Sequence, residues 1–437
     1  MNKFFIKTLG CQMNEYDSYI ITKVLQDSGF MVEVFDLYEA NILILNTCSV
    51  REKARDKIYS ELGMWKKLKD IRNNIIICVG GCVASLDGYN IFKRAPYVDV
   101  VFGPQTLDKL VHMIDESLLK KSKVIDNSFS GISKFNNVFS IDNVKGISSY
   151  LTVAEGCSKY CSYCIVPYSR GHEISRSFNS IMSEVYVLAM QGVKEIILLG
   201  QNVSSYLGLI NSNSFANLSL LIGYINNIDE ISRIKFISPN PLDFDDFLIS
   251  SYEKNYKLSN HLHLPLQSGS NKILNLMKRG YAIEDYRNII CKLKKIRNEI
   301  TISTDIIVGF PGESNNDFQD TVDFVSEMFF DMSFVYVYSP RLNTLAFNMK
   351  DDVSLSEKKR RLNILNGILI DQSNKITNSM LGTVQRVLFY KYDNGKLIGK
   401  TDNNRVVILS ENHRYVGKSL NVLIKEKNSI NLSGNLV

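Results

Sequence analysis

Three cysteines stand close together near the middle of the chain, at Cys157, Cys161 and Cys164. Three thiolates on one short loop suit a cubane iron–sulfur cluster, because cysteine is the usual ligand of such clusters and three ligands leave the fourth iron open. A structural zinc ion would require four protein ligands, and His172 is the nearby candidate for the fourth. The spacing therefore favours an iron–sulfur cluster with an open iron over zinc and over a chance group of core cysteines.

A second set of cysteines is distant in sequence but similar in placement. Each member falls just past the end of an expected strand: Cys11 after KTLG, Cys48 after LILNT and Cys82 after CVGG. In an open parallel sheet the loops beyond the carboxyl ends of the strands gather at one edge, where ligands bind. The three thiols could therefore meet there as metal ligands; on spacing alone, three unrelated thiols are an equally good interpretation.

The chain has eight cysteines, which are too few for a disulfide scaffold in 437 residues. The two outside the sets are Cys78, inside an apolar strand pattern, and Cys291, inside a helical pattern. We predict that both are core thiols.

The amino-terminal part of the chain must position the second set. Short apolar runs alternate there with helical patterns, which is typical of a parallel sheet with helices on its faces. We predict an α/β domain at residues 1–120 and a polar linker rich in Ser and Asn at residues 121–144.

A second series of strand and helix patterns begins near Tyr150. Six runs are strand-like: YLTVAEG, KEIILLGQN, RIKFIS, HLHLPLQSGS, ISTDIIVGFPG and MSFVYVYS. Six such units predict a partial, TIM-like barrel at residues 145–375, since the closed form has eight, and active residues should follow its strands. Short alternating strands punctuated by Gly and Asn then predict a small β-barrel at residues 376–437.

Composition narrows the class of protein. With 45% hydrophobic and 22% charged residues, the chain can build cores and is neither disordered nor fibrous. The longest near-apolar stretch, residues 75–86, is too short for a bilayer span, and the amino terminus lacks the apolar core of a secretory signal. We predict a cytoplasmic protein with no membrane segment.

Charge is distributed unevenly along the chain. The net charge is +6, and residues 382–437 hold nine Lys or Arg against four Asp or Glu. A basic terminal module favours a polyanionic partner, with a solvated surface as the alternative.

The local cysteine loop, GCSKYCSYC, resembles the signature of radical S-adenosylmethionine enzymes. The resemblance implies that the open iron chelates the amino and carboxylate groups of S-adenosylmethionine, and that one electron cleaves this cofactor to a 5′-deoxyadenosyl radical. It also implies that Tyr163 packs near the adenine of the cofactor. The alternative is that Tyr163 is a loop aromatic that fills the mouth of the barrel.

The segments GCQMNEYDS, NTCSVREKA and GGCVAS resemble the amino-terminal domain of methylthiotransferases, in which three such cysteines hold an auxiliary cluster. The implied cofactors are two 4Fe–4S clusters and S-adenosylmethionine. The implied iron ligands are both cysteine sets: Cys11, Cys48, Cys82, Cys157, Cys161 and Cys164. The terminal module is similar to the RNA-binding TRAM domain, so the resemblance covers essentially the whole chain.

Within these methylthiotransferases, the chain looks most like the MiaB-type branch, which acts on tRNA. The segments are GCSKYCSYCIVPYSRGHEISR, ILLGQNVSSY, LPLQSGS, DIIVGFPGE and GKTDNNRVV. The implied reaction converts N6-(dimethylallyl)adenosine to its 2-methylthio form at position 37, next to the anticodon, in tRNAs reading codons that begin with uridine. The alternatives act on threonylcarbamoyladenosine in tRNA or on ribosomal protein S12; residues 200–203 and 401–407 are the discriminating segments.

Further roles and partners follow from the resemblance. Cofactor contacts are expected from residues after the barrel strands: Tyr163, Gly200, Gln201, Asn202, Gln267 and Ser268. Phosphate contacts are expected from Arg386, Lys400 and Arg405, each with an ordinary solvated charge as the alternative. The expected partners are a tRNA anticodon loop and an electron donor such as flavodoxin or ferredoxin, and the chain is expected to be a monomer.

Two positions depart from the family pattern. Ser177 stands where the family usually has Pro, and Leu342-Asn343 stands where it usually has Pro-Gly. We expect both departures to lie in loops.

Overall fold

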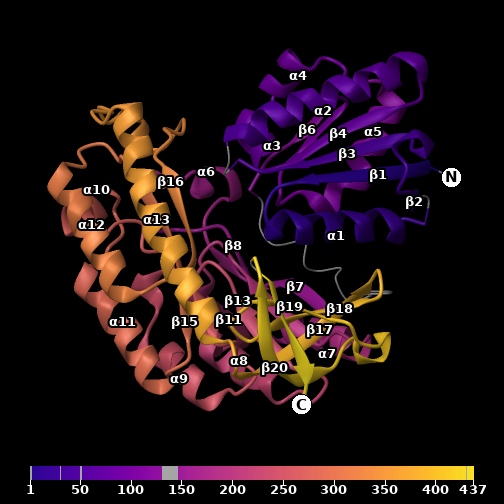
Figure 1. Ribbon diagram of the computed structural model, residues 1–437. Helices are drawn as coiled ribbons and strands as arrows, with labels where there is room; N and C mark the ends of the chain where they lie inside the picture. Colours follow the sequence, from indigo (N-terminus) through magenta and orange to yellow (C-terminus); the bar gives the residue numbers. More distant parts are fainter. Residues whose placement is uncertain (1, 30, 50–51, 130–145, 430) are drawn as a thin grey trace. The chain divides into compact units, whose positions relative to one another are not determined.

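The structure, a computed structural model, describes residues 2–29, 31–49, 52–129, 146–429 and 431–437, and only the backbone of residues 52–56. The chain forms two compact units (Figure 1). The first unit comprises Met1–Asp142, Thr152–Ser158 and Ile165–Arg176, and the second comprises Asn143–Leu151, Lys159–Cys164 and Ser177–Val437.

The first unit is built on a six-stranded sheet in the order β2-β1-β3-β4-β5-β6, and all of its neighbouring strands are parallel. Its strands are β1 Asn2–Leu9, β2 Met31–Glu33, β3 Ile42–Thr47, β4 Ile76–Gly81, β5 Val100–Phe102 and β6 Val124–Asp126. The central strand β3 is buried at every position, as expected where helices cover both faces of a parallel sheet. The predicted parallel α/β fold is thus confirmed.

The helices of this sheet follow its strands. They are α1 Gln12–Asp27, α2 Glu52–Ile71, α3 Cys82–Asp87, α4 Asn90–Arg94 and α5 Leu110–Lys120. The fully buried Trp65 of α2 meets the ring of Phe5 edge-on at a centroid distance of 6.4 Å. This contact helps to pack α2 onto the sheet.

One boundary of the predicted linker is wrong. Residues 124–126, which were predicted to belong to the linker, form β6, because the short run Val-Ile-Asp pairs in parallel with β5. Residues 130–144 of the predicted linker lie outside the described residues.

The second unit contains the barrel strands in two three-stranded sheets, β13-β10-β7 and β14-β15-β16. These strands are β7 Ser148–Thr152, β10 Glu195–Leu199, β13 Arg233–Phe236, β14 His261–His263, β15 Thr301–Val308 and β16 Asp331–Val337. A parallel bridge between Ile234 and Leu258 lies between the two sheets. The six strands confirm the partial barrel.

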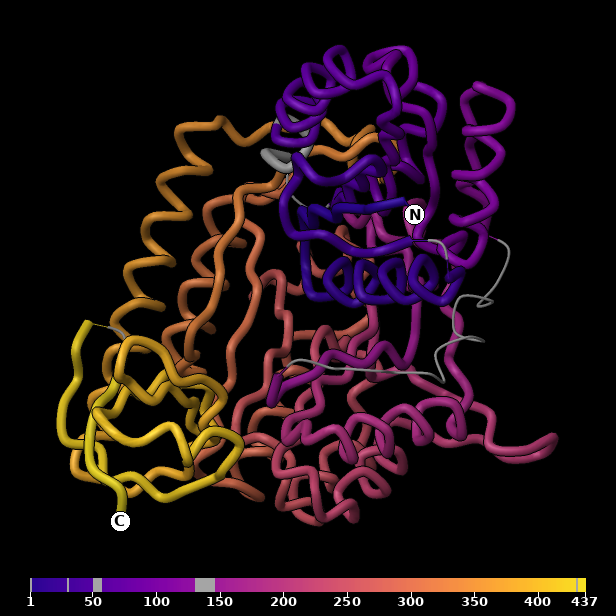
Figure 2. Tube along the Cα trace, turned by 90° about the vertical axis from the view of Figure 1, so that its right-hand side faces the viewer, coloured from indigo at the N-terminus to yellow at the C-terminus, as the bar shows by residue number. Residues whose placement is uncertain are grey.

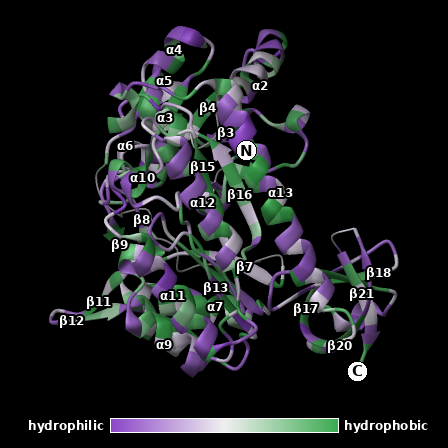
Figure 3. Ribbon diagram, turned by 60° about the vertical axis from the view of Figure 1, so that its left-hand side comes forward, coloured by the Kyte–Doolittle hydropathy of each residue, from purple (hydrophilic) through white to green (hydrophobic). Residues whose placement is uncertain are grey.

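Helices cover these strands. They are α7 Phe178–Met190, α8 Leu218–Asn226, α9 Asp246–Lys254, α10 Asn271–Leu276, α11 Ile283–Ile296, α12 Asn315–Met328 and α13 Leu355–Ser379. Figure 3 shows hydrophilic residues along α13 interrupted by hydrophobic ones, which is the pattern of a helix with one buried face. Cys291 in α11 is exposed, so its prediction as a core thiol is wrong, whereas Cys78 in β4 is buried as predicted.

The carboxy-terminal strands close into a small barrel, drawn in orange to yellow in Figure 2. Their order around the barrel is β17-β18-β19-β21-β20. They are β17 Val384–Asp393, β18 Lys396–Thr401, β19 Val406–Leu409, β20 Ser419–Asn428 and β21 Asn431–Leu436. Alternate residues of these strands form one apolar core that includes Val387, Phe389 and Val422. The predicted small β-barrel is confirmed.

The end of β18 and the segment that joins it to β19 hold this small barrel against the strands of the partial barrel. Arg233, the first residue of β13, donates from Nη1 to the carbonyl oxygens of Lys400 and Thr401 at 3.0 and 2.7 Å. Arg405 forms an ion pair with Asp331, the first residue of β16. The small barrel therefore docks at the amino ends of the strands, whereas TIM-like enzymes place active residues at the carboxyl ends.

Both departures from the family pattern keep the local backbone that the usual residues favour. Ser177 has a φ of −63°, close to the value to which proline is fixed, and caps α7 by accepting a hydrogen bond from the backbone of Ser180. Asn343 has a φ of +71°, in the left-handed region that glycine favours and asparagine tolerates. Ser177 precedes a helix, and Leu342-Asn343 lies in a loop as predicted.

We expect Arg405→Ala to lower the free energy of unfolding by about 3–5 kcal/mol, because Asp331 would remain buried and lose its ion-pair partner. Urea denaturation followed by circular dichroism measures the loss. The control is Lys396→Ala at the exposed first residue of β18, which should change stability by less than about 0.5 kcal/mol. Equal stability of the two variants would contradict the docking role of Arg405.

Candidate iron–sulfur sites

The strand register of the first unit brings the distant cysteines to one edge of the sheet. Leu9 of β1 is paired with Thr47 of β3, and Thr47 is paired with Gly81 of β4, so the three strands end level with one another. One cysteine follows each of these ends within two residues: Cys11, Cys48 and Cys82. Adjacent parallel strands thus place the three thiols at one edge, as the sequence predicts.

Cys11 and Cys48 are in direct contact. A hydrogen bond between the two thiols, together with the positive charge of Arg170 and the backbone amides of Asn14 and Met13, outweighs burial and lowers the pKa of Cys11 to about 6. Cys11 caps the amino end of α1, a position that stabilises a thiolate. Cys48 and Cys82 are only 4% and 5% exposed.

Close backbone approach at this edge requires two glycines that the sequence analysis did not single out. A Cβ on Gly10 would lie 2.5 Å from Oδ1 of Asn14 and 2.9 Å from the Cβ of Cys48. A Cβ on Gly81, whose φ is +89°, would lie 2.3 Å from the carbonyl oxygen of Thr47. Asn14 is fully buried and donates to that same carbonyl at 2.9 Å. These residues hold the three cysteine loops together.

A buried arginine, also missed from the sequence, lies among these thiols. Arg170 is 2% exposed and donates from Nε to Sγ of Cys82 at 3.3 Å. Its Nη1 and Nη2 donate to Glu155 and Asp17 at 2.9 and 2.6 Å. Burial opposes the charge of Arg170, but Asp17, Cys82, Glu155 and Cys11 together raise its pKa well above the usual value. Its one sequence signal is its place in the segment VPYSRG after the local cysteine loop.

The donor chemistry of this edge fits an iron–sulfur cluster. Its three thiols are the ligand type that such clusters use, and a cationic donor to a cysteine sulfur can balance the negative charge of a thiolate-ligated cluster. Within the described part of the chain, no three Cys, His, Asp or Glu side chains are preformed as a site for a single metal ion. The argument for a cluster rests on the convergence of the thiols and on their contacts.

Cys157 of the local cysteine loop belongs to the first unit. Gly156 before it has a φ of +78°, and a Cβ there would lie 2.0 Å from the carbonyl oxygen of His172. The backbone N–H of Cys157 donates to the carbonyl oxygen of Gly171 at 3.2 Å. This pair of contacts fixes the start of the loop.

In the second unit, Cys161 is held much as Cys82 is in the first. Arg279, which is largely buried, donates from Nη1 to Sγ of Cys161 at 3.3 Å. The next residue, Ser162, donates from its backbone to Met277 at 2.9 Å and from its hydroxyl to Leu276 at 2.8 Å. The backbone N–H of Cys164 donates to the carbonyl oxygen of Cys161 at 2.9 Å. The second half of the loop is therefore anchored at the end of α10.

Tyr163 lies between these cysteines and packs, partly buried, against a cluster that includes Met277, Phe310 and Tyr338. Burial raises the pKa of its hydroxyl well above the usual value. The structure thus shows the apolar packing that the alternative interpretation described. A contact with adenine stays a prediction.

The segment after β10 supports the cysteine loop through a polar relay. Asn202 is buried and donates from Nδ2 to the carboxylate of Asp243 at 2.7 Å. Asp243 in turn forms an ion pair with Lys159 at 2.7 Å. Lys159 lies inside the cysteine loop. Asn202 therefore positions that loop, and its side-chain amide is committed to Asp243. Gly200 and Gln201 precede it at the carboxyl end of β10, and their cofactor contacts stay predictions.

The two residues expected after β14 differ in their roles. Gln267 has a φ of +73° and joins the sheet through backbone hydrogen bonds with Asp305 and Ile307, so its cofactor contact stays a prediction. Ser268 is fully buried, and its hydroxyl contacts the hydroxyl of Thr321 and the backbone N–H of Ser270. The prediction that Ser268 binds cofactor is wrong, because its side chain stabilises this turn.

Of the three predicted phosphate contacts, the one from Arg405 is wrong. Arg405 is 3% exposed and bonded to Asp331 and Thr377, so its guanidinium is not available to RNA. Arg386 is committed in part to an ion pair with Asp402 at 2.7 Å, and Lys400 lies 5.8 Å from the centre of the Tyr390 ring. Positive charge alone could not show which side chains were already paired.

A different surface of the small barrel combines exposed cations with aromatic rings. Arg414 and Lys418 lie 4.8 and 5.7 Å from the centre of the Tyr415 ring, and His413 meets Tyr392 edge-on. We call these five residues the basic aromatic patch. Aromatic rings interleaved with cations are typical of single-stranded nucleic-acid binding surfaces.

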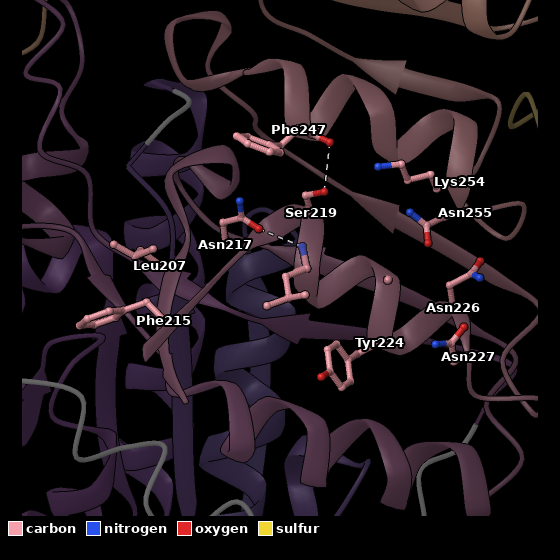
Figure 4. Close-up of a pocket in the computed structure, with 12 residues that line it drawn as sticks. Leu207, Phe215, Asn217, Ser219, Tyr224, Asn226, Asn227, Phe247, Lys254 and Asn255 are labelled. Carbon is pink, nitrogen blue, oxygen red and sulfur yellow. Dashed lines mark hydrogen bonds between the residues drawn. The ribbon is translucent and has the colours of Figure 1, made fainter. Parts of the chain in front are cut away.

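A pocket lies on the outer helices of the second unit. It is lined by residues of the β11–β12 hairpin (Leu207–Asn211 and Ser214–Asn217), α8 and α9, among them Phe215, Tyr224 and Phe247 (Figure 4). Its polar side chains serve the fold: Asn217 caps α8, and Ser219 donates to the carbonyl oxygen of Phe247. No cysteine lines this pocket.

None of the helices described is long and apolar enough to cross a lipid bilayer.

Three family models match consecutive parts of the chain. Residues 3–103 match the Uncharacterized protein family UPF0004, residues 151–325 match the Radical SAM superfamily, and residues 378–437 match the TRAM domain. These segments contain, in turn, the cysteine set Cys11, Cys48 and Cys82, the local cysteine loop, and the small barrel.

Curated relatives match the chain over its full length and are named tRNA-2-methylthio-N(6)-dimethylallyladenosine synthase. One from Legionella pneumophila (strain Corby) is 47% identical over 440 residues and covers 100% of this chain and 98% of the relative. One from Buchnera aphidicola subsp. Acyrthosiphon pisum (strain APS) is 48% identical over 439 residues and covers 100% of both.

Solved structures share the fold at low identity. The radical S-adenosylmethionine methyltransferase TsrM from Kitasatospora setae has a TM-score of 0.57 at 15% identity and covers 79% of this chain and 77% of its own. The cobalamin-dependent S-adenosylmethionine radical enzyme OxsB has a TM-score of 0.53 at 11% identity and covers 86% of this chain and 56% of its own.

We expect the full chain to hold about eight irons after anaerobic reconstitution, four in each of two cubane clusters. Replacing either cysteine set by alanine, as in Cys11→Ala/Cys48→Ala/Cys82→Ala or Cys157→Ala/Cys161→Ala/Cys164→Ala, should leave about four. Iron and acid-labile sulfide analysis measures both, and Cys291→Ala is the control that should keep about eight. Full iron content in either triple variant would contradict the corresponding ligand set.

Proposed function

Because this chain belongs to the family of radical S-adenosylmethionine methylthiotransferases, we propose that it methylthiolates carbon 2 of N6-(dimethylallyl)adenosine at position 37 of tRNA. The observation that carries the proposal is the full-length match, at 47% identity, to a relative named for this product. The convergence of the second cysteine set at one sheet edge supports it, since this reaction needs a sulfur source as well as a radical source. The preference for tRNAs that read codons beginning with uridine is part of the proposal.

The chemistry explains why two cysteine sets would be needed. The hydrogen on carbon 2 of adenine is not usefully acidic and its carbon is not nucleophilic, so general acid–base catalysis cannot readily replace it. When bound, the two clusters and S-adenosylmethionine would supply radical hydrogen abstraction and a methylated sulfur for transfer. Position 37 lies in a single-stranded loop, where a base can leave its stack at modest cost.

Residues of this chain would ligate the two clusters and keep their ligands in place. Cys157, Cys161 and Cys164 would ligate the radical-generating cluster, and Arg279 would stabilise the sulfur of Cys161. The relay from Asn202 through Asp243 to Lys159 would keep the cysteine loop in place. Cys11, Cys48 and Cys82 would ligate the auxiliary cluster.

The organisation of the chain follows the same proposal. Residues 1–120 would form the methylthiotransferase amino-terminal domain. Strand β6, at residues 124–126, adds the last strand to its sheet. Residues 145–375 would form the radical domain and residues 376–437 the TRAM domain, whose basic aromatic patch would contact the anticodon arm. The proposal includes a cytoplasmic location, a monomeric enzyme and an electron donor such as flavodoxin or ferredoxin.

We expect a deletion strain to lose the 2-methylthio form of N6-(dimethylallyl)adenosine from its tRNA and to regain it with the wild-type chain. In vitro, Cys157→Ala should abolish 5′-deoxyadenosine formation, because the radical-generating cluster loses a ligand. Cys48→Ala should keep cofactor cleavage and lose sulfur transfer. Nucleoside mass spectrometry and chromatography of 5′-deoxyadenosine measure these outcomes.

Cys291→Ala is the control for thiol loss and should retain both steps. An unchanged methylthio nucleoside in the deletion strain would eliminate the proposed substrate. Loss of a methylthio group from threonylcarbamoyladenosine or from ribosomal protein S12 instead would identify one of the alternative reactions.

We expect Arg414→Ala/Lys418→Ala to weaken tRNA binding and to make it less salt-dependent, because each lost phosphate contact removes about 0.7 from the slope of log K against log salt on single-stranded RNA. Fluorescence anisotropy over a salt series measures the slope. Lys425→Ala/Lys427→Ala on β20 removes the same charge from the same barrel and is the control. Equal effects of the two double variants would contradict the patch and indicate attraction by net charge.

A further inference from the structure

Arg170 has an arrangement that ordinary packing does not explain. Its guanidinium is buried, and each of its three nitrogens donates to a different element of the first unit. Nε donates to Cys82 at the start of α3, Nη1 to Glu155 in β8 (Ala154–Glu155), and Nη2 to Asp17 in α1. The planar, fixed fork of arginine can hold three such partners in one geometry, which lysine cannot do.

The three partners are each tied closely in sequence to an expected cluster ligand. Cys82 is itself a ligand, and Asp17 lies in the helix that Cys11 caps. Glu155 is separated from Cys157 only by Gly156, the glycine whose positive φ turns the chain into the cysteine loop. Arg170 therefore contacts the supports of both cysteine sets within the first unit.

The position of Arg170 is fixed from its backbone as well. Its carbonyl oxygen accepts a hydrogen bond from the buried side chain of Gln105 at 2.7 Å. The helix that carries it, α6 Val166–Arg170, also packs against α3, which begins at Cys82. The Nε donor is therefore held toward the sulfur from both ends of the residue.

The charges around the guanidinium of Arg170 also bear on its role. Two carboxylates, Asp17 and Glu155, face the single guanidinium, and both are buried with it. The carboxylates outnumber the guanidinium by one, so the positive charge of Arg170 is already fully balanced before it meets the Cys82 sulfur. Its Nε–H therefore offers the sulfur a directed hydrogen bond rather than an excess of buried positive charge.

We propose that Arg170 is a positioning residue that fixes the Cys82 sulfur relative to the strand leading into Cys157, and that its Nε–H raises the reduction potential of the cluster held by Cys11, Cys48 and Cys82. This inference rests on the proposed function, because it requires a cluster at that cysteine set. Hydrogen bonds to cluster sulfurs stabilise the more negative, reduced state, so losing the donor makes reduction less favourable.

The test uses the full chain with Cys157→Ala, Cys161→Ala and Cys164→Ala, so that only the other set can hold a cluster. Arg170→Lys is introduced into this parent to keep the charge and lose the fork. A second variant, Arg170→Met with Asp17→Asn, removes one positive and one negative charge together, so the hydrogen-bond donor is lost while the net charge around the cysteine set is unchanged. The control is Arg176→Lys. Arg176 is equally buried in the same unit and donates to Tyr16 and Thr152.

Redox titration monitored by electron paramagnetic resonance gives the midpoint potential of the remaining cluster. We expect both Arg170 variants to be harder to reduce, with about a tenfold change in the reduced-to-oxidised ratio at a fixed potential, which is about 59 mV for a one-electron couple. The control should match the parent. Loss of iron from the Arg170 variants at an unchanged unfolding temperature, with iron kept in Arg176→Lys, would also support the proposal.

Equal potentials in the Arg170 variants and in Arg176→Lys would overturn the proposal. Loss of iron that accompanies unfolding of both Arg170 variants would also overturn it, since the residue would then serve stability alone. If the parent itself holds no iron, the inference falls together with the auxiliary-cluster part of the proposed function. The parent measurement separates that outcome from a failure confined to Arg170.

Discussion

The parallel register of β1, β3 and β4 is the constraint on which the placement of Cys11, Cys48 and Cys82 depends. Parallel neighbours lie about 4.8 Å apart, so residues that end level on three adjacent strands are spread over about 10 Å, a span that cysteine side chains and short loops can close. The level ends at Leu9, Thr47 and Gly81 make this possible. A register slip of one residue would also exchange the faces of a buried strand, so core packing and ligand placement are set by the same pairing.

The sequence was sufficient for those parts of the site that depend on local pattern. Strand ends and the alternation of strands and helices predicted the parallel sheet, the sheet edge at which Cys11, Cys48 and Cys82 lie, the partial barrel and the small β-barrel. The ligand roles of both cysteine sets stay predictions. Arg170 and Asn14 were missed because their partners are brought together only by the fold: Arg170 meets Cys82 across 88 positions of sequence. Arg405 and Ser268 were misassigned because residue type reveals neither burial nor an existing partner.

Buried guanidinium groups recur wherever this chain must hold segments from distant parts of the sequence. Arg170 and Arg279 each donate to a cysteine sulfur, and Arg405 joins the small barrel to β16. Breaking a buried charge pair is costly because the remaining partner stays desolvated, whereas forming it gives little net stability. These groups are therefore better understood as fixing geometry than as adding stability, and this explains why they lie at junctions between elements.

In the second unit, the amino ends of the barrel strands dock the small barrel, and the carboxyl ends support the cysteine loop. Arg233 and Asp331, the first residues of β13 and β16, are occupied by the end of β18 and by Arg405, which follows it. The residues after β10 and β14, at the carboxyl ends, are left to the cysteine loop and its supports. Docking uses Arg405, so positive charge alone does not identify an RNA surface on the small barrel. Exposed cations such as Lys396 and Lys425 remain elsewhere on it, whereas Arg414 and Lys418 lie beside the ring of Tyr415. The proposed RNA surface around Tyr415 therefore depends on stacking and charge acting together.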